Sequence, residues 1–402
     1  MGVSWLIRSW STLDITLGME YYSRPEVFLG TEVSVKLSPS TFKVYEEVFG
    51  LGTAAAPERP QDEVKCFKRR KLLAVMCKKG ISTLEAVWLL RRVGVKLEYW
   101  GIKDADAETC QFVVLRCLRD MVVSSSLVRG IKLYVLKPLD PESTPRKYQL
   151  AGNFFEVLLS YTTSSPERII STIESSAGLN YLNYFGYQRF GTVRPITHVV
   201  GRAIAVGDYD GALNYLVGYS SSAESPRVRA ARKLFTEGHY RDSLRSFPSS
   251  FAIERSVLKK YIETRNPREA IARGLPLNLL KFFVESYQSY LFNKALSLLA
   301  TTAGSIEDVE RECEVLELPR PGIKAQGCAR YSYESLAEDL GAQLKSVNKA
   351  LFIKSIREAV FRVNNLRTNT LTDGVIKLSF KLGRGSYATV YLRELLRDNL
   401  VF

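Results

Sequence analysis

The sequence contains very little histidine, and this scarcity limits the chemistry open to it. Among 402 residues, only His198 and His239 occur. A Ser-His-Asp triad needs a histidine as its base, and HExxH proteases need two at fixed spacing. Neither arrangement is present. Triad hydrolysis and histidine-based metal catalysis are therefore disfavoured.

Cysteine is also sparse, and no Cys-x-x-Cys pair occurs. Zinc ribbons and redox dithiols, which need closely spaced thiols, have no support. We expect most thiols to be buried as small hydrophobic groups, in a reducing compartment, the cytoplasm. The six cysteines are Cys66, Cys77, Cys110, Cys117, Cys313 and Cys328.

Long apolar runs are absent as well, and we expect neither a secretory signal nor a myristoylation signal. No stretch reaches the roughly 18 apolar residues that a membrane helix needs. Residues 1–6 lack the charged start of a secretory signal, and Leu6 stands where a myristoylation signal has Ser or Thr. The 46 % hydrophobic content and the length instead predict a globular protein of two or three domains, with no membrane partner.

Positive charge is in clear excess. Lys and Arg total 56 against 42 Asp and Glu, a formal net charge of +14. This excess favours a polyanionic partner, and nucleic acid is favoured over membrane because no basic amphipathic N-terminal helix is present. The alternative is a basic protein without such a partner. The basic run at 68–71 is either a solvated edge or a phosphate contact.

The first 190 residues predict mainly strands. Residues 31–37 and 42–46 alternate as two strands around a turn at 38–40, and 50–66 predicts a loop. Ser82 and Glu85 have capping-box spacing at the start of a helix that Gly94 closes. Further strands are predicted at 95–99, 111–116, 131–137 and 153–160.

The pattern then becomes helical and finally returns to a strand. Residues 374–382 alternate cleanly as a half-buried strand. A sheet, a helical block and a second sheet segment predict an α+β domain interrupted by an inserted one. The predicted helices are 209–217, 227–235, 252–264, 275–299 and 332–358.

A polar turn follows the strand at 95–99. It contains Gly101, Lys103 and Asp104, followed by the segment 107–111. A carboxylate in such a turn is presented at a sheet edge, where it can react. The alternative is an Asx-turn in which Asp104 caps its own loop.

The segment 183–191 reads Asn-Tyr-Phe-Gly-Tyr-Gln-Arg-Phe-Gly. Aromatic rings interleaved with amide and guanidinium groups suit a surface that stacks and reads RNA bases. The alternative is a buried aromatic turn. A third segment, Gly-Ser-Tyr-Ala-Thr at 385–389, is either a weak phosphate-loop signal or a strand-to-helix turn capped by Ser386.

Taken together, these segments closely resemble the TruD-type pseudouridine synthases. The nine-residue segment 183–191 matches the family pattern completely and is the most specific match. Lys36 stands six residues before a Phe-x-Val-x-Glu strand that also matches. The other matching segments are Gly-x-Lys-Asp at 101–104, Ala-x-Thr-x-Gln at 107–111, Gly-Ser-Tyr-Ala-Thr at 385–389, Arg-Glu at 393–394 and, more faintly, 287–293. The continuation from Arg194 to His198 looks like the archaeal and eukaryotic branch.

The resemblance implies an α+β fold with a mostly antiparallel sheet. Residues 1–194 and 359–402 would form the discontinuous catalytic domain, and 195–358 the helical insertion. The reaction would isomerise a uridine in tRNA, at position 13 if the usual target applies, to pseudouridine. It would need no metal, nucleotide or redox cofactor, and we expect a monomer.

The resemblance also assigns roles to residues. Asp104 would be the nucleophile or base, and Lys36 the cation that keeps it ionised. Phe185 and Tyr387 would wall the flipped uracil.

Three further residues would serve the same pocket. Asn183 would bond the polar edge of the base or hold the Asp104 loop, and Phe42 would stack on an adjacent base or support the pocket. Arg189 would contact a phosphate or pair with a carboxylate such as Glu46. Two alternatives remain: a synthase of this family acting on another RNA site, and a non-catalytic RNA-binding protein.

Overall fold

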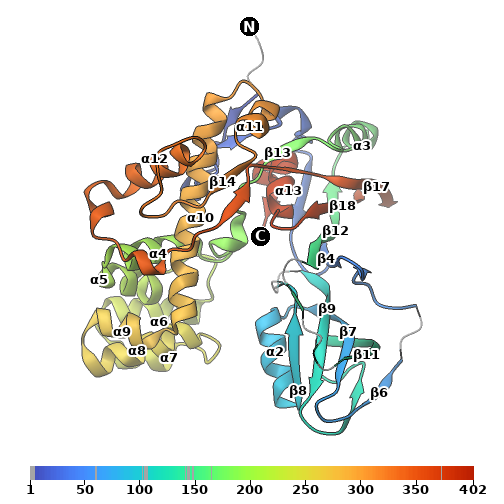
Figure 1. The fold of residues 1–402 in the computed structure, drawn as a ribbon, viewed down its shortest axis with the longest axis horizontal. Coiled ribbons are helices and arrows are strands. Elements are labelled where there is room, and N and C mark those ends of the chain that lie inside the picture. The colour runs from blue at the N-terminus through green and yellow to red at the C-terminus, as the bar shows by residue number, and fades with distance from the viewer. Residues whose placement is uncertain are drawn as a thin grey trace. The chain divides into compact units, whose positions relative to one another are not determined.

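The computed structural model divides the chain into two compact units (Figure 1). It describes residues 5–58, 61–101, 103, 107–140, 142, 145–146, 149–163, 165–372 and 374–402. The sheet unit comprises Arg24–Tyr181 and Phe361–Phe402, and the helical unit comprises Met1–Ser23 and Leu182–Val360. The two sheet segments therefore flank the helical block along the chain, as the sequence predicts.

The sheet unit is built on a mixed sheet whose main path runs in the order β11-β7-β9-β4-β12-β18-β17. Neighbours on this path are antiparallel except β4 and β9, which are parallel. The bounds are β4 (Phe42–Val48), β7 (Lys71–Lys79), β9 (Glu108–Cys117), β11 (Ile131–Leu139), β12 (Leu150–Tyr161), β17 (Asn364–Thr372) and β18 (Val375–Gly383). The predicted α+β class is thus confirmed.

Most predicted strands are confirmed, and so is the helix α2 (Thr83–Arg92), whose N-cap Ser82 accepts a hydrogen bond from the Glu85 N–H. The strands β3 (Val33–Lys36) and β4 both pair with β12. The loop prediction for 50–66 is wrong at its end, where β6 (Glu63–Cys66) pairs with β10 (Met121–Ser124). Three of the four residues of β6 are not buried, so the apolar alternation that reveals a strand is missing.

An aromatic column links the sheet to the last helix, α13 (Ala388–Leu396). Phe42 stacks on Phe155 at 5.9 Å between ring centroids, and Phe155 stacks on Phe380 at 5.2 Å. Phe380 meets the edge of Tyr391 at 4.9 Å. Every residue of α13 is buried, so the segment 385–389 leads directly into the core.

The expectation of free thiols is wrong, because all six cysteines form disulfides. Cys77 and Cys110 are directly opposite on β7 and β9, where strand pairing joins residues 33 positions apart. Such neighbours arise from register and cannot be inferred from sequence spacing. The cysteine content therefore no longer supports a reducing compartment. The other pairs are Cys66–Cys117 and Cys313–Cys328.

The helical unit packs around the long helix α10 (Leu277–Thr302). The close crossing of α10 and α4 requires Gly201, because a Cβ atom there would lie 1.9 Å from the carbonyl oxygen of Phe283. Among the described residues, no helix is both long and apolar enough to cross a bilayer. The remaining helices include α4 (Thr197–Val206), α5 (Tyr209–Leu213), α6 (Pro226–Thr236), α7 (Tyr240–Ser246), α8 (Ala252–Thr264), α9 (Pro267–Gly274), α11 (Ile306–Glu312) and α12 (Ala329–Leu340).

The predicted helix at 332–358 is wrong in its second half. The helix α12 ends at Leu340, where Gly341 adopts a positive φ of 49°. Short 3-10 turns follow, and β15 (Ile356–Glu358) pairs with β14 (Val315–Glu317). The predicted helices at 227–235, 252–264 and 275–299 are confirmed. The one at 209–217 is an α-helix only from Tyr209 to Leu213 and continues as a π-helical turn over Asn214–Gly218.

The compact units differ from the expected domains at their edges. Residues 5–23 and 182–194 pack with the helical unit, whereas the resemblance placed them in the catalytic domain. The domain limits 1–194 with 359–402, and 195–358, refer to function and stay a prediction.

Candidate active site

The turn that contains Asp104 is anchored by a buried ion pair. Asp104 itself lies outside the described residues, but Lys103 immediately before it is described. The Lys103 Nζ is 2.8 Å from Oε1 of the fully buried Glu46 on β4. Burial raises the pKa of the Glu46 carboxyl, whereas Lys103 and the Phe112 N–H, which donates to Glu46 Oε2 at 3.2 Å, act in the opposite direction.

A hydrogen-bond network fixes the backbone of this turn. Thr83 Oγ1 accepts from the Lys103 N–H at 2.9 Å and donates to Gln111 Oε1 at 2.8 Å. Gln111 Nε2 donates to the Gly101 carbonyl at 2.9 Å, and Lys78 Nζ donates to the Lys103 carbonyl at 3.1 Å. The backbone is therefore held on both sides of residue 102.

Gly101 is required by this packing. A Cβ atom at this position would lie 2.9 Å from both Glu46 Oε1 and Lys103 Nζ. The Gly-x-Lys motif and the downstream Gln111 are thus parts of one network, which explains their spacing.

Two buried ammonium groups accompany the turn. Lys78 is 1 % exposed and Lys103 is 8 % exposed. Cations near a carboxylate favour its ionised form. From the sequence, only Lys36 is expected in this role. Lys78 is not expected there, because a lysine on an apolar strand gives no signal of its position.

Lys36 and Phe42 lie at either end of the turn between β3 and β4. Lys36 is exposed at the end of β3, where its carbonyl accepts from Thr41 Oγ1 at 2.6 Å. Phe42 is buried in the aromatic column, and this packing favours the supporting role over stacking on a base. The pairing of Lys36 with Asp104 stays a prediction.

Tyr387 lies at the N-cap of α13 and is partly exposed. Its carbonyl accepts from the Val390 N–H at 3.0 Å. The strand-to-helix turn is present, but its cap residue is Tyr387 and not Ser386. Gly385 adopts a φ of 89°, which explains a glycine at this turn.

In the helical unit, Asn183 is held by Arg357 of β15. The guanidinium donates to Asn183 Oδ1 at 2.7 Å and to the Asn183 carbonyl at 2.9 Å. The Asn183 Nδ2 donates to the carbonyl of Glu358 at 3.1 Å. The amide is therefore oriented on both sides. Sequence reasoning missed Arg357, which the prediction had placed in a helix.

Phe185 is surrounded by groups from two other elements. The Arg357 Cζ lies 4.1 Å from the ring centroid, and Phe292 of α10 meets the ring edge-on at 5.4 Å. Asn293 clamps the Phe185 backbone, accepting from its N–H at 2.7 Å and donating to its carbonyl at 3.1 Å. The segment 287–293, which matches the family pattern only faintly, thus holds the backbone of the segment 183–191, which matches it most specifically.

Arg189 pairs with a carboxylate, but the partner is not Glu46. Its Nη2 lies 3.3 Å from Glu285 Oε2, and its Nε donates to Ser289 Oγ at 3.0 Å. Glu46 pairs with Lys103 instead. Both partners of Arg189 lie on α10, so this arginine ties the 183–191 segment to that helix.

The predicted site residues therefore fall into two groups. Lys36, Phe42 and Tyr387 belong to the sheet unit, together with the anchors of the Asp104 turn. Asn183, Phe185 and Arg189 belong to the helical unit. A single pocket made from both groups stays a prediction.

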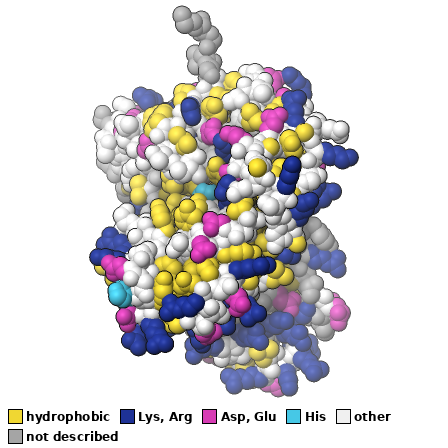
Figure 2. Space-filling view, turned by 90° about the vertical axis from the view of Figure 1, so that its left-hand side faces the viewer, with side chains coloured by type: hydrophobic (Ala, Val, Ile, Leu, Met, Phe, Trp, Pro, Cys, Tyr) yellow, Lys and Arg dark blue, Asp and Glu magenta, His cyan; other side chains and the backbone are white. Residues whose placement is uncertain are grey.

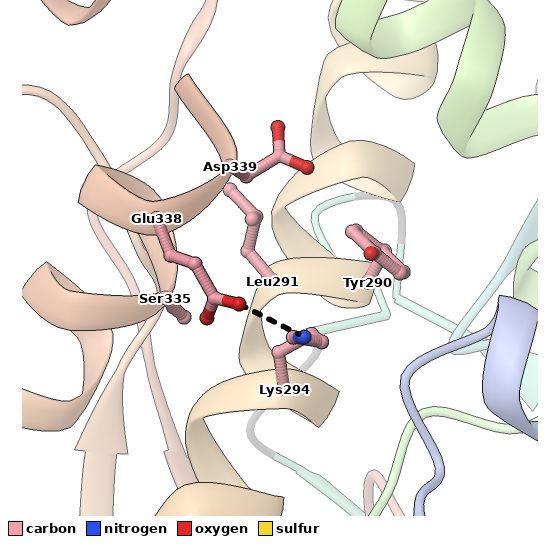
Figure 3. A pocket seen from close by; sticks show the side chains of 6 residues that line it. All are labelled: Tyr290, Leu291, Lys294, Ser335, Glu338 and Asp339. Atoms are coloured by element: carbon pink, nitrogen blue, oxygen red, sulfur yellow. Dashed lines mark ion pairs between the residues drawn. The ribbon is translucent and has the colours of Figure 1, made fainter. Parts of the chain in front are cut away.

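A separate pocket of about 260 Å³ lies between α10 and α12 in the helical unit (Figure 3). Lys294 lies 3.3 Å from Glu20 and 3.7 Å from Glu338, and Asp339 pairs with Arg202 at 2.8 Å. These charges are already compensated by the protein. Within the described residues, no group of three or more His, Cys, Asp or Glu is placed to hold a metal ion.

Comparisons with known proteins agree with the resemblance. The family model of tRNA pseudouridine synthase D (TruD) matches residues 16–320. A "Probable tRNA pseudouridine synthase D" of Saccharolobus solfataricus is 32 % identical over 394 residues, 96 % of this chain and 97 % of that protein. Another from Sulfurisphaera tokodaii is 30 % identical over 389 residues, 95 % of this chain and 98 % of that protein.

The fold is also similar to a solved structure. The crystal structure of a Methanosarcina mazei protein assigned as TruD superposes with a TM-score of 0.62 at 21 % identity, covering 96 % of this chain and 98 % of that one. At this identity the similarity concerns the fold alone. On the family match and the two full-length relatives, the chain belongs to the tRNA pseudouridine synthase D family.

Proposed function

We propose that the protein isomerises a uridine in tRNA to pseudouridine, at position 13 if it shares the family's usual target. The observation that carries this proposal is the buried network of Glu46, Lys103 and Gln111, which fixes the turn leading to Asp104. A purely RNA-binding protein would not need two buried lysines and a buried carboxylate behind the turn that leads to Asp104. Burying charged groups costs free energy, which ion pairing and hydrogen bonding offset only in part, so an RNA-binding surface alone gives no reason to bury them here.

In this reaction, one bond to the ribose breaks and another forms. The bond between ribose C1′ and uracil N1 breaks, the base turns, and C1′ bonds to C5. C5 then loses its proton and N1 gains one, so the product is an isomer of the substrate. Asp104 acts as the nucleophile or as the base in this sequence. Lys36, Lys78 and Lys103 supply the positive charge that keeps it ionised near neutral pH.

The remaining residues hold the base. A uridine in structured RNA must leave its stack to be reached, at a cost of a few kcal/mol. Phe185 and Tyr387 wall the extruded uracil, while Asn183 bonds its polar edge, oriented for this by Arg357. Phe42 supports the pocket from the core, and Arg189 keeps the 183–191 segment in place.

The setting of the enzyme follows from this substrate. The catalytic domain comprises 1–194 and 359–402, and 195–358 form an insertion. The protein acts as a monomer in the cytoplasm. Its tRNA substrate supports this location, which the cysteine content no longer supports. It needs no metal, nucleotide or redox cofactor.

The test is isomerisation of tRNA by purified protein. Pseudouridine should appear in an unmodified tRNA incubated with the protein and should be absent with Asp104→Asn, which keeps the shape and removes the charge. The variant should bind tRNA with nearly unchanged affinity. Near-normal turnover by Asp104→Asn would contradict the catalytic assignment, and modification at another position would replace uridine 13 as the target.

A further inference from the structure

An open groove of about 590 Å³ lies in the helical unit. None of the residues that line it belongs to the candidate active site. One side is formed by residues 218–220, after the π-helical turn Asn214–Gly218, and the other by α6. Its volume is within the range of about 300–1,000 Å³ typical of small-molecule sites. The groove is lined by Gly218, Tyr219, Ser220, Arg229, Ala230, Lys233 and Thr236.

The charge of this groove is positive. Arg229 and Lys233 are four residues apart on α6, so their side chains lie on the same face of the helix. None of the described residues that line the groove is acidic. Lys233 lies 3.6 Å from Glu237, but both side chains are largely exposed, and such surface pairs are weak. In the described part of the chain, the Arg229 side chain makes no ion pair. Figure 2 shows Lys and Arg side chains on the face turned to the viewer, interspersed with acidic and hydrophobic ones.

The groove also offers aromatic surface. Tyr219 is 50 % exposed, and its neighbour Tyr215 is 38 % exposed, with ring centroids 6.5 Å apart. Exposed aromatic rings beside cations are the combination that single-stranded nucleic acid uses, through base stacking and phosphate contacts.

Two arginines hold this aromatic turn rigid. Arg194 donates to the carbonyls of Tyr215 at 3.0 Å and Tyr219 at 2.8 Å. The fully buried Arg232 donates to the carbonyls of Leu216 at 2.9 Å and Val217 at 3.0 Å. π-helical turns are rare and occur often at functional sites.

The arginines are in turn fixed by carboxylates. Glu254 Oε1 lies 3.2 Å from Arg194 and 3.1 Å from Arg232, and Glu224 Oε1 lies 2.8 Å from Arg232. Burial, followed by the charge of Arg232, lowers the pKa of Arg194 to about 10, so it stays charged at neutral pH. A preorganised turn loses little conformational freedom when a ligand binds. This also gives the Arg194 segment, which the proposed reaction does not use, a role.

We propose that this groove is a second RNA site, which binds an unpaired nucleotide of the substrate outside the reaction centre. A base stacks on Tyr219, and the adjoining phosphate lies between Arg229 and Lys233. The proposal rests on the proposed function, because it takes the ligand to be the same tRNA. It predicts a contribution to affinity and none to the chemical step.

The test compares tRNA binding by two matched double variants. Arg229→Gln with Lys233→Gln removes the groove cations, and Lys259→Gln with Arg273→Gln removes two exposed cations of α8 and α9. The groove variant should bind at least about fivefold more weakly than the control. Its slope of log affinity against log salt should be smaller by about 1–2, as for two lost phosphate contacts. Single-turnover rates at saturating enzyme should match for both.

A third variant separates stacking from charge. Tyr219→Ala should weaken binding with little change in the salt slope, and Tyr219→Phe should restore it, since a phenyl ring also stacks. Equal losses in the groove and control variants, at unchanged melting temperature, would show a general charge effect and overturn the site. If the wild-type protein does not isomerise tRNA uridine, the proposed function fails, whereas isomerisation with an unaffected groove variant rejects only the second site.

Discussion

The Arg357 guanidinium contacts the Phe185 ring and the Asn183 amide at the same time. Its Cζ lies 4.1 Å from the ring centroid, and its Nη2 donates to Asn183 Oδ1 at 2.7 Å. One cation thus covers the aromatic ring and sets which way the amide points. Because an Asn amide has a donor end and an acceptor end, this contact fixes Oδ1 toward Arg357 and Nδ2 toward the Glu358 carbonyl.

Arg357→Lys should slow the chemical step and leave tRNA affinity nearly unchanged. Lysine keeps the charge but lacks the planar fork that reaches the side chain and the carbonyls together. We expect a single-turnover rate about tenfold lower, equivalent to about 1.4 kcal/mol. The matched control is Arg362→Gln, which removes another arginine–asparagine contact, between Arg362 and Asn180 at 2.6 Å. Equal rate losses in both variants would indicate a merely structural role.

Truncating Phe185 or Tyr387 should lower the rate of the chemical step, whereas truncating the exposed Lys68 should weaken tRNA binding. Phe185→Ala and Tyr387→Ala should each lower the single-turnover rate by roughly 5- to 150-fold, since base stacking is worth about 1–3 kcal/mol and helps once the base has flipped. Lys68→Ala should raise the dissociation constant alone, because a phosphate contact acts equally on ground and transition states. If Phe185→Ala changed only affinity, the pocket would have to be placed elsewhere.

Lys78→Met should shift the pH dependence of the reaction. Lys78 is buried and donates to the carbonyls of Ile81 and Lys103, so its charge lies beside the Asp104 turn. Without that cation, the pKa of a nearby carboxyl rises, and the acidic limb of the rate profile should move to higher pH.

The control for this variant is Lys71→Met, on the same strand. Lys71 is also buried but pairs with Glu98 at 3.7 Å. A lost lysine should destabilise both proteins, which thermal unfolding will measure, but only Lys78→Met should move the limb. An unchanged profile would remove Lys78 from the site.

His198 should make the fold sensitive to mild acid. Burial lowers its pKa to about 4, against a small opposing effect of the Thr16 carbonyl, and its ring stacks on Tyr290. Between about pH 6.5 and 4 the unfolded chain binds a proton that the folded chain does not. The free energy of unfolding should therefore decrease as the pH is lowered through this window, by up to about 3 kcal/mol. In His198→Gln the fall should be shallower by that amount, and an equal slope would contradict the assignment.

Local sequence patterns by themselves were enough to predict many helices and strands of this protein. The alternation at 374–382 became β18, and the spacing of Ser82 and Glu85 became a capped helix, because periodicity and capping act between near neighbours in the chain. The segment 183–191 indicated the family from nine adjacent residues, and the family match confirms it.

Only the tertiary structure decided what depends on residues far apart in sequence. Strand register placed Cys77 opposite Cys110, and chain packing placed Glu46 against Lys103 across 57 positions and Arg357 against Asn183 across 174. These contacts leave no periodic signal, since each needs one suitable side chain at each end and nothing between. The sequence could therefore single out the turn proposed to react, whereas the charges and hydrogen bonds around Lys103 arise from the fold.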